Sequence, residues 1–175
     1  LSFLSIPAPT LSHLTYLQLH YDGDGSEQPW SGLSACLASM PILRHLDIME
    51  HCPCCWPKGI SHLQHLTHLS LWCNSHAPPC APPPFPHPLP QLQALHLGCS
   101  AAFSAANSSQ PLPFPEKLRT VCPQLSHLVC CLVDGPALVR ALPALTGLTE
   151  LEFQHCDLSG EPRDLGHLQS LQPAC

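Results

Sequence analysis

The chain has 175 residues, of which 45% are hydrophobic and 10% are charged, so it can bury one substantial core and lacks the charge density of a disordered tail. Its net charge is -6 with only 6 Lys and Arg residues, which is too few cations for a nucleic-acid-binding surface. No apolar run reaches the roughly 18 residues that cross a bilayer, and residues 1–9 carry no signal peptide. We therefore expect no nucleic-acid partner and no membrane segment in this chain.

The cysteines are numerous, 12 in all, but their spacing is irregular. Several occupy positions where a small buried apolar residue is expected, and a free cysteine behaves as such a residue. We therefore expect reduced thiols and an intracellular protein rather than a disulfide scaffold.

One apolar spacing, L-x-x-L-x-x-L-x-L, recurs from one end of the chain to the other. Its last two positions are Leu17 and Leu19, Leu46 and Ile48, Leu69 and Leu71, Leu95 and Leu97, Leu128 and Cys130, and Leu151 and Phe153. These two positions flank a single residue, which is the alternation of a β-strand. The spacing predicts strands near 16–20, 45–49, 68–72, 94–98, 127–131 and 150–154 within one domain, 1–175. A further copy begins at Leu168 and Leu171, and the pattern stops in mid-repeat, so we expect a partial chain.

The segments between the strands differ from one repeat to the next. Residues 32–39 favour a helix with Ser31 as its N-cap, and 115–121 and 134–142 favour helices that have a proline in the first turn. The proline-rich insertion 77–90 excludes regular helix and central strand, which leaves a polyproline-II loop. The insertion 101–115 explains the longest interval between repeats and is expected to be flexible.

The repeated pattern resembles the leucine-rich-repeat family, whose period is roughly 20–29 residues. The residues three positions after the second strand position resemble the family's asparagine ladder: Asp22, His51, Asn74, Ser100 and Cys156. The segment 145–171 is similar to plant-type repeats, whereas the helical segments between the strands resemble the ribonuclease-inhibitor-like type. The resemblance implies an α/β solenoid of horseshoe shape, with a parallel sheet on its concave face and short helices and loops on its convex face.

The resemblance also implies a non-catalytic scaffold that binds another protein through the concave strands. For the cytoplasmic location that reduced thiols favour, the family suggests substrate-adaptor, cytoskeletal or ciliary axoneme scaffold roles. The alternative is the ligand-recognition part of a cell-surface receptor-like protein. A count of free thiols separates the two, because an ectodomain of this composition would hold several disulfides.

The outward strand positions form three rows, with neighbours about 4.8 Å apart. The first row is Tyr16, His45, His68, Ala94, His127 and Glu150; the second is Gln18, Asp47, Ser70, His96, Val129 and Glu152; the third is His20, Met49, Trp72, Gly98, Cys131 and Gln154. We call these three rows the strand face. Its candidate partner-binding residues are Tyr16, Gln18, His20, His45, Asp47, His68, Ser70, Trp72, His96, Glu150 and Glu152.

The acidic residues cluster on or just after the strands, and most Lys and Arg residues lie in the segments between the strands. This distribution favours a partner whose contact surface is basic or polar. His45 and His68 are expected side by side, so their protonation would weaken the face at low pH.

The region 51–80 contains Cys52, Cys54, Cys55, Cys73 and Cys80 with nearby histidines, which raises the alternative of a zinc or catalytic site. The spacing is not that of a zinc knuckle, and the sequence has no nucleophile-elbow or phosphate-loop motif. We expect no enzyme activity, no cofactor and no metal.

Overall fold

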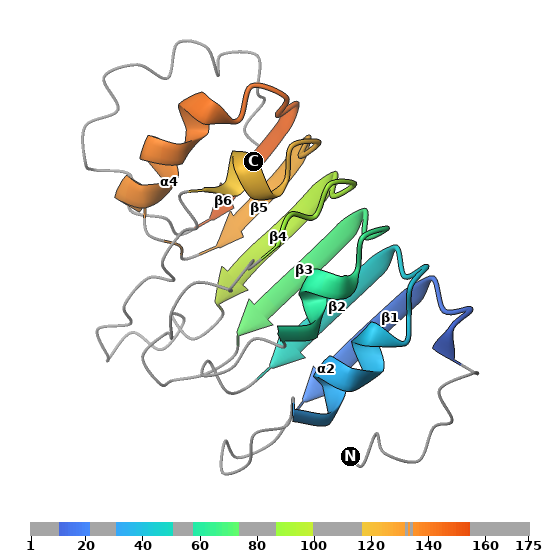
Figure 1. The fold of residues 1–175 in the computed structure, drawn as a ribbon. Helices are drawn as coiled ribbons and strands as arrows, with labels where there is room; N and C mark the ends of the chain where they lie inside the picture. The colour runs from blue at the N-terminus through green and yellow to red at the C-terminus, as the bar shows by residue number, and fades with distance from the viewer. Residues whose placement is uncertain are drawn as a thin grey trace, which may run out of the picture.

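The computed structural model describes residues 11–21, 31–50, 58–73, 87–99, 117–131, 133 and 135–154. Six strands form one parallel sheet in chain order (Figure 1), which confirms the predicted α/β solenoid fold class. The strands are β1 (Tyr16–Tyr21), β2 (His45–Glu50), β3 (His68–Cys73), β4 (Ala94–Cys99), β5 (His127–Cys131) and β6 (Glu150–Gln154). Each strand begins at the residue that the repeated spacing indicates.

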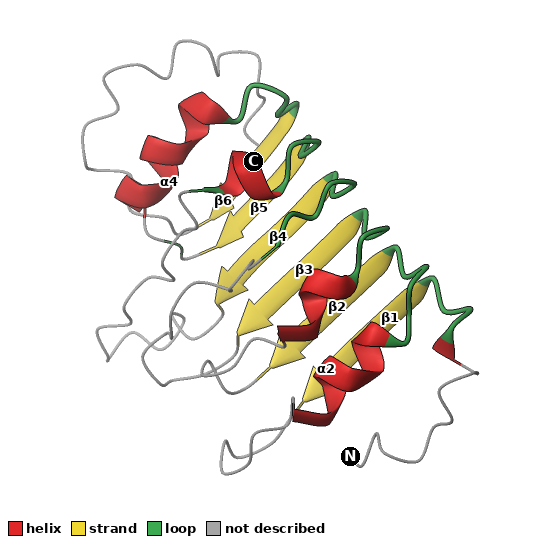
Figure 2. Ribbon diagram, in the orientation of Figure 1, coloured by secondary structure: helices red, strands yellow, loops and turns green. Residues whose placement is uncertain are grey.

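The helices that the structure describes all lie on one side of the sheet (Figure 2), and they form the return segments, which connect one strand to the next. They are α2 (Ser31–Ala38), the 3-10 helix η2 (Lys58–His62), α3 (Leu118–Val121), α4 (Gly135–Ala141) and the 3-10 helix η4 (Leu142–Ala144). The sequence indicated α2 and α4 to within a residue or two, and Ser31 lies inside α2 rather than before it. The helix predicted from 115 begins only at Leu118.

The segments between the strands differ from the prediction at one helix, and parts of them lie outside the described residues. The helix η2 was not predicted, because Gly59 at its second position weakens any helical signal. Of the proline-rich insertion only 87–90 is described, and there Leu89 is 1% exposed and its N–H donates to the carbonyl of Val121 at 2.7 Å. The insertion 101–115, the turn positions of the asparagine ladder and the copy at Leu168 lie outside the described residues.

The core lies between the sheet and the helices. Register pairing aligns Leu17, Leu46, Leu69, Leu95, Leu128 and Leu151 across the sheet. All but Leu17 are buried, and Leu17 is half-buried because no described strand precedes β1. Burying one such leucine contributes about 1.5–3 kcal/mol, so stacking of the repeats is the main source of stability. Phe153 was expected inside, yet it is 43% exposed because no described strand follows β6.

Side-chain hydroxyls join neighbouring repeats at the amino-terminal ends of the strands. Thr67 Oγ1 donates to the carbonyl of Arg44 at 3.0 Å, Ser126 Oγ to that of Gln93 at 3.2 Å, and Thr149 Oγ1 to that of Ser126 at 3.1 Å. Each donor directly precedes a strand, and each acceptor is the equivalent residue of the preceding repeat. We call these three contacts the hydroxyl ladder.

The returns also approach one another closely on the helical side. The backbone of Gly59 in η2 lies so near α2 that an added Cβ would meet the Ser34 carbonyl oxygen at 2.6 Å and its Cα at 2.8 Å. Only a residue without a side chain fits between the two elements.

Candidate protein-interaction face

The strand face is the side of the sheet that carries no helix. The register pairs Tyr16 with His45, His45 with His68, and His127 with Glu150, and it aligns the second and third rows in the same way. Every candidate residue named from the sequence therefore lies in the row expected for it. Some outward positions are nevertheless covered: Ala94 is 7% exposed and Cys131 is 4% exposed.

Aromatic and imidazole rings form a continuous strip at the start of the first row. The rings of His45 and His68 stack with centroids 4.2 Å apart and planes 16° apart, and Tyr16 lies 6.1 Å from His45 at 38°. The expected adjacency of the two histidines is thus confirmed. Burial, reinforced by the neighbouring His45, lowers the pKa of His68 below 6.5, which favours its neutral form.

A polar cluster crosses from β1 to β2 beside these rings. Tyr16 Oη donates to Gln18 Oε1 at 3.2 Å, and Gln18 Nε2 donates to Asp47 Oδ2 at 3.3 Å. Gln18 Nε2 also lies 3.0 Å from His20 Nε2, so that ring nitrogen accepts. The second carboxylate oxygen, Asp47 Oδ1, is covered from solvent, and no donor among the described residues reaches it.

A hollow of about 230 Å³ opens in the strand face between β1 and β4. It exists because Ser70 and Ala94 have short side chains while their neighbours are longer. Its lining consists of Tyr16, His45, Leu46, Asp47, His68, Leu69, Ser70, Ala94 and His96. The hollow therefore combines imidazole and phenol rings with one carboxylate.

His96 closes the far side of this hollow. Burial lowers its pKa below 6.5, and the carboxylates of Asp47 and Glu152 oppose this effect without cancelling it. A neutral ring offers one nitrogen acceptor and one N–H donor. His96 therefore adds hydrogen-bonding capacity to the hollow without adding positive charge at neutral pH.

Trp72 in the third row lies over the backbone of Gly98 on the next strand. A Cβ at position 98 would meet ring atoms Cε3 and Cζ3 of Trp72 at 2.4 Å. The indole thus occupies the space that a side chain at position 98 would fill. Because Gly98 has no side chain, the half-buried Trp72 ring can pack on the backbone at this position and remain part of the strand face.

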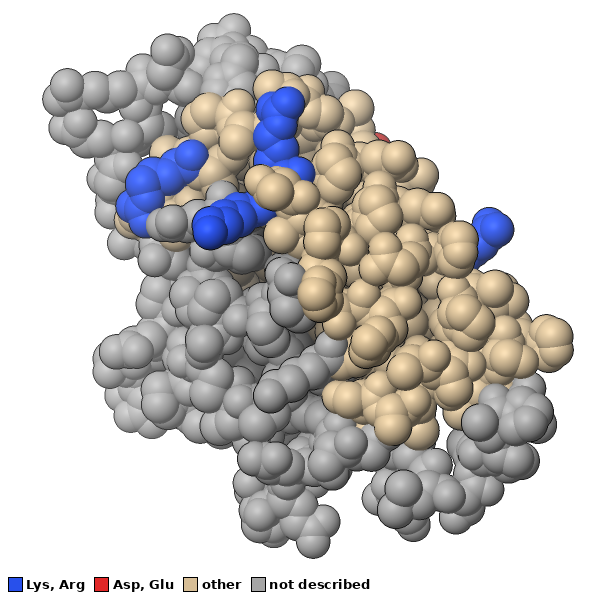
Figure 3. Space-filling view, viewed as in Figure 1, with Lys and Arg blue, Asp and Glu red and all other residues tan. Residues whose placement is uncertain are grey.

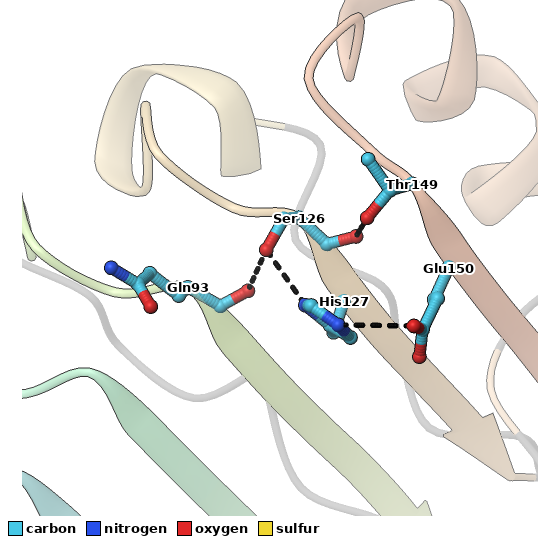
Figure 4. A network of polar contacts seen from close by, with 5 residues as sticks. All are labelled: Gln93, Ser126, His127, Thr149 and Glu150. Atoms are coloured by element: carbon cyan, nitrogen blue, oxygen red, sulfur yellow. Dashed lines mark hydrogen bonds and ion pairs between the residues drawn. The ribbon is translucent and has the colours of Figure 1, made fainter.

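A second polar network joins β5 and β6 (Figure 4). His127 Nε2 lies 3.2 Å from Glu150 Oε1, and His127 Nδ1 lies 2.7 Å from Ser126 Oγ. A serine, a histidine and a carboxylate in this order resemble a catalytic triad. However, Thr67 Oγ1 and His68 Nδ1 make the same contact at 2.9 Å, and both hydroxyls belong to the hydroxyl ladder. The strand register alone is therefore sufficient to produce this arrangement.

The hydroxyl ladder and His127 were not among the candidate residues named from the sequence, whereas Glu150 was. A signal for the ladder does exist, since Thr67, Ser126 and Thr149 occupy the same position of the repeat. His127 was placed in the first row, and its register with Glu150 was enough to indicate the pair.

Charge is divided between the two sides of the described structure. The carboxylate side chains that the structure describes are Asp47, Glu150 and Glu152, all on outward strand positions. Figure 3 shows the helical side, where Lys and Arg are prominent among the coloured residues and Asp and Glu are nearly absent. Arg119 donates to the carbonyl of Ala144 at 2.7 Å and so joins two of the segments between strands.

Most cysteines of the alternative zinc site, namely Cys52, Cys54, Cys55 and Cys80, lie outside the described residues. Within the described ranges, no three His, Cys, Asp or Glu side chains are placed to hold a metal ion. Among the described helices, none has the length and apolar character that crossing a membrane requires.

Comparison with known proteins gives no further assignment: no family model matches the chain, and no curated protein matches its sequence. The structure itself defines the class as an α/β solenoid, in which six parallel strands and their short helical returns form a repeating unit.

Proposed function

We propose that the chain is a non-catalytic scaffold of the leucine-rich-repeat type, which binds a partner protein through the strand face. The observation that carries the proposal is the contrast between the two sides of each strand. Inward positions hold buried Leu and Ile, whereas outward positions present an imidazole strip, an indole and carboxylates. Tyr16, which is 56% exposed, and Trp72 are of the residue types that anchor protein interfaces.

The proposed partner has a basic or polar contact surface. The described carboxylates lie on the strand face, and burial favours the neutral forms of His68 and His96 at neutral pH. A positively charged surface would therefore meet attraction there and little repulsion.

We place this scaffold in the cytoplasm, with cytoskeletal and ciliary sites as the specific proposals. Support comes from Cys122, which is a free thiol in a buried position and so acts as a small core residue. Core packing of reduced cysteines suits a reducing compartment.

Two charge-matched variants test the proposal. Tyr16→Glu places a carboxylate on the strand face, and Ala35→Glu places the same group on an exposed position of α2. Proteins captured by the tagged wild-type chain from cell extract are purified, and their affinities for both variants are measured by calorimetry. We expect Tyr16→Glu to weaken binding of a genuine partner at least tenfold, about 1.4 kcal/mol, and Ala35→Glu to leave it unchanged. Partners that bind both variants equally, or that are lost only with Ala35→Glu, would refute the proposal.

A further inference from the structure

We propose that the hollow of the strand face binds the guanidinium group of an arginine side chain carried by the partner protein. This inference rests on the proposed function, because it names what the partner presents to the face. It is carried by three observations: the size of the hollow, a carboxylate with an unused oxygen, and walls made of flat rings.

The size of the hollow fits one side chain better than a free ligand. Its volume is about 230 Å³, while pockets for small molecules usually measure about 300–1,000 Å³. One water molecule occupies about 30 Å³ in the liquid, so the hollow holds the equivalent of several waters. The planar end of a long side chain can displace these waters while its backbone remains on the partner.

The charge of the hollow selects a cation. Asp47 is half-buried, its Oδ2 accepts one long bond of 3.3 Å from Gln18, and its Oδ1 has no donor among the described residues. A covered carboxylate oxygen without a donor is unfavourable, so a donor from outside stabilises it. Asp47 is itself one of the residues that line the hollow, so its carboxylate is the negative charge that an entering cation meets.

The walls favour guanidinium over ammonium. His45 and His68 present stacked rings, and Tyr16 continues the strip beside them. A guanidinium group stacks on such faces and directs five N–H donors within one plane, whereas an ammonium group is a compact, strongly hydrated charge. Acceptors lie side by side in the second row along the hollow, at Asp47, Ser70 and His96. The coplanar N–H groups of one guanidinium can donate to several of these acceptors at once.

Other occupants fit the observations less well. An anion would meet the Asp47 carboxylate, and a metal ion would need a group of three ligating side chains, which the described residues do not provide. The cations among the described side chains are Arg44, Lys117, Arg119 and Arg140, and none of them lines the hollow. Among the described side chains, no Lys or Arg therefore occupies the place beside Asp47 in the hollow.

The test uses N-acetyl-arginine amide as the probe and the full 175-residue chain as the receptor. The probe is titrated at pH 7.5 while the ring signals of His45, His68 and His96 are followed by NMR. We expect saturable shifts of these signals with a millimolar dissociation constant. N-acetyl-citrulline amide, which has the same shape without the charge, should bind at least tenfold more weakly. N-acetyl-lysine amide should also bind more weakly than the arginine probe.

Two variants then locate the site. Asp47→Asn should weaken binding of the arginine probe at least tenfold, provided that its circular dichroism spectrum and melting temperature show a folded chain. Ala35→Lys changes the net charge by the same amount on α2, outside the hollow, and should leave the affinity within twofold of wild type.

Equal binding of the arginine and citrulline probes by the wild-type chain would overturn the inference without reference to any variant. Shifts in the ring signals that persist in folded Asp47→Asn would overturn it as well. Failure of this test is distinct from failure of the proposed function. If Tyr16→Glu abolishes partner binding while the arginine probe does not bind, the face is used but the hollow is not. If the probe binds while no partner depends on the face, the site stands and the scaffold proposal fails.

Discussion

Replacing Gly59 with alanine is the sharpest test of how the returns pack. The new methyl group would lie 2.6 Å from the Ser34 carbonyl oxygen and 2.8 Å from its Cα, and these are backbone atoms that cannot rotate away. Overpacking of this kind costs about 1–3 kcal/mol, and removing a glycine returns about 0.4–1 kcal/mol by restricting the unfolded chain. The net loss is therefore about 1–2 kcal/mol. In a chain of this size each kcal/mol lowers the melting temperature by about 2–4 °C.

The assay is thermal unfolding followed by circular dichroism, with Gly147→Ala as the matched control. At Gly147 an added Cβ would have its nearest contact at 3.6 Å, with the Leu125 carbonyl oxygen, so that variant should melt at or slightly above the wild-type temperature. Adding Ser34→Ala to Gly59→Ala should not restore stability, because the obstruction is the backbone of Ser34. Equal melting temperatures for Gly59→Ala and Gly147→Ala, or rescue by Ser34→Ala, would refute the described approach of η2 to α2.

Three further predictions concern the thiols, the histidines and the indole. Burial raises the pKa of Cys122 to about 12, so at pH 8 it should resist alkylation in the native chain and react only after unfolding, as read by peptide mass mapping. Burial lowers the pKa of His68 and His96 below the unfolded value of 6.5, so the unfolded state binds more protons as the pH falls. Their contribution to stability is then full above about pH 6.5 and decreases as the pH falls through the lowered folded values; replacing both by Gln should flatten the urea midpoint between pH 7.5 and 5. Gly98→Ala should displace the Trp72 ring with a smaller loss of stability than Gly59→Ala, because the obstructing atoms are the end of a half-buried side chain, and an unchanged indole N–H signal in the NMR spectrum would contradict the contact.

The sheet was predictable because its signal is repeated. A single strand pattern such as 16–20 is weak, but stacking requires every copy to agree, and the observed register joins Leu17 to Leu46 and Leu46 to Leu69 as the spacing requires. The returns were less predictable, since α3 is one turn long and η2 contains a glycine. Their formation depends on burial of residues such as Ile60 and Leu118 against the sheet rather than on local preference.

The composition of the strand face followed from the same register, but its detailed geometry did not. Sequence order is sufficient to place His45 beside His68, whereas the 4.2 Å stacking of their rings depends on side-chain torsions. The hollow depends on the absence of bulk at Ser70 and Ala94, and small side chains carry no binding signal of their own in a sequence. The unused oxygen of Asp47 depends on which neighbours donate, and that requires coordinates.

Each strand makes its extensive contacts only with the strand before it and the strand after it. An exchange on an outward position such as Glu150 therefore disturbs its immediate neighbours and leaves Tyr16, at the opposite margin, untouched. Binding specificity can accordingly be altered on one strand at a time, while the buried leucines of the sheet continue to stabilise the fold. In evolution or in protein engineering, the outward residues of each strand can therefore be changed separately, because all strands share the same buried core.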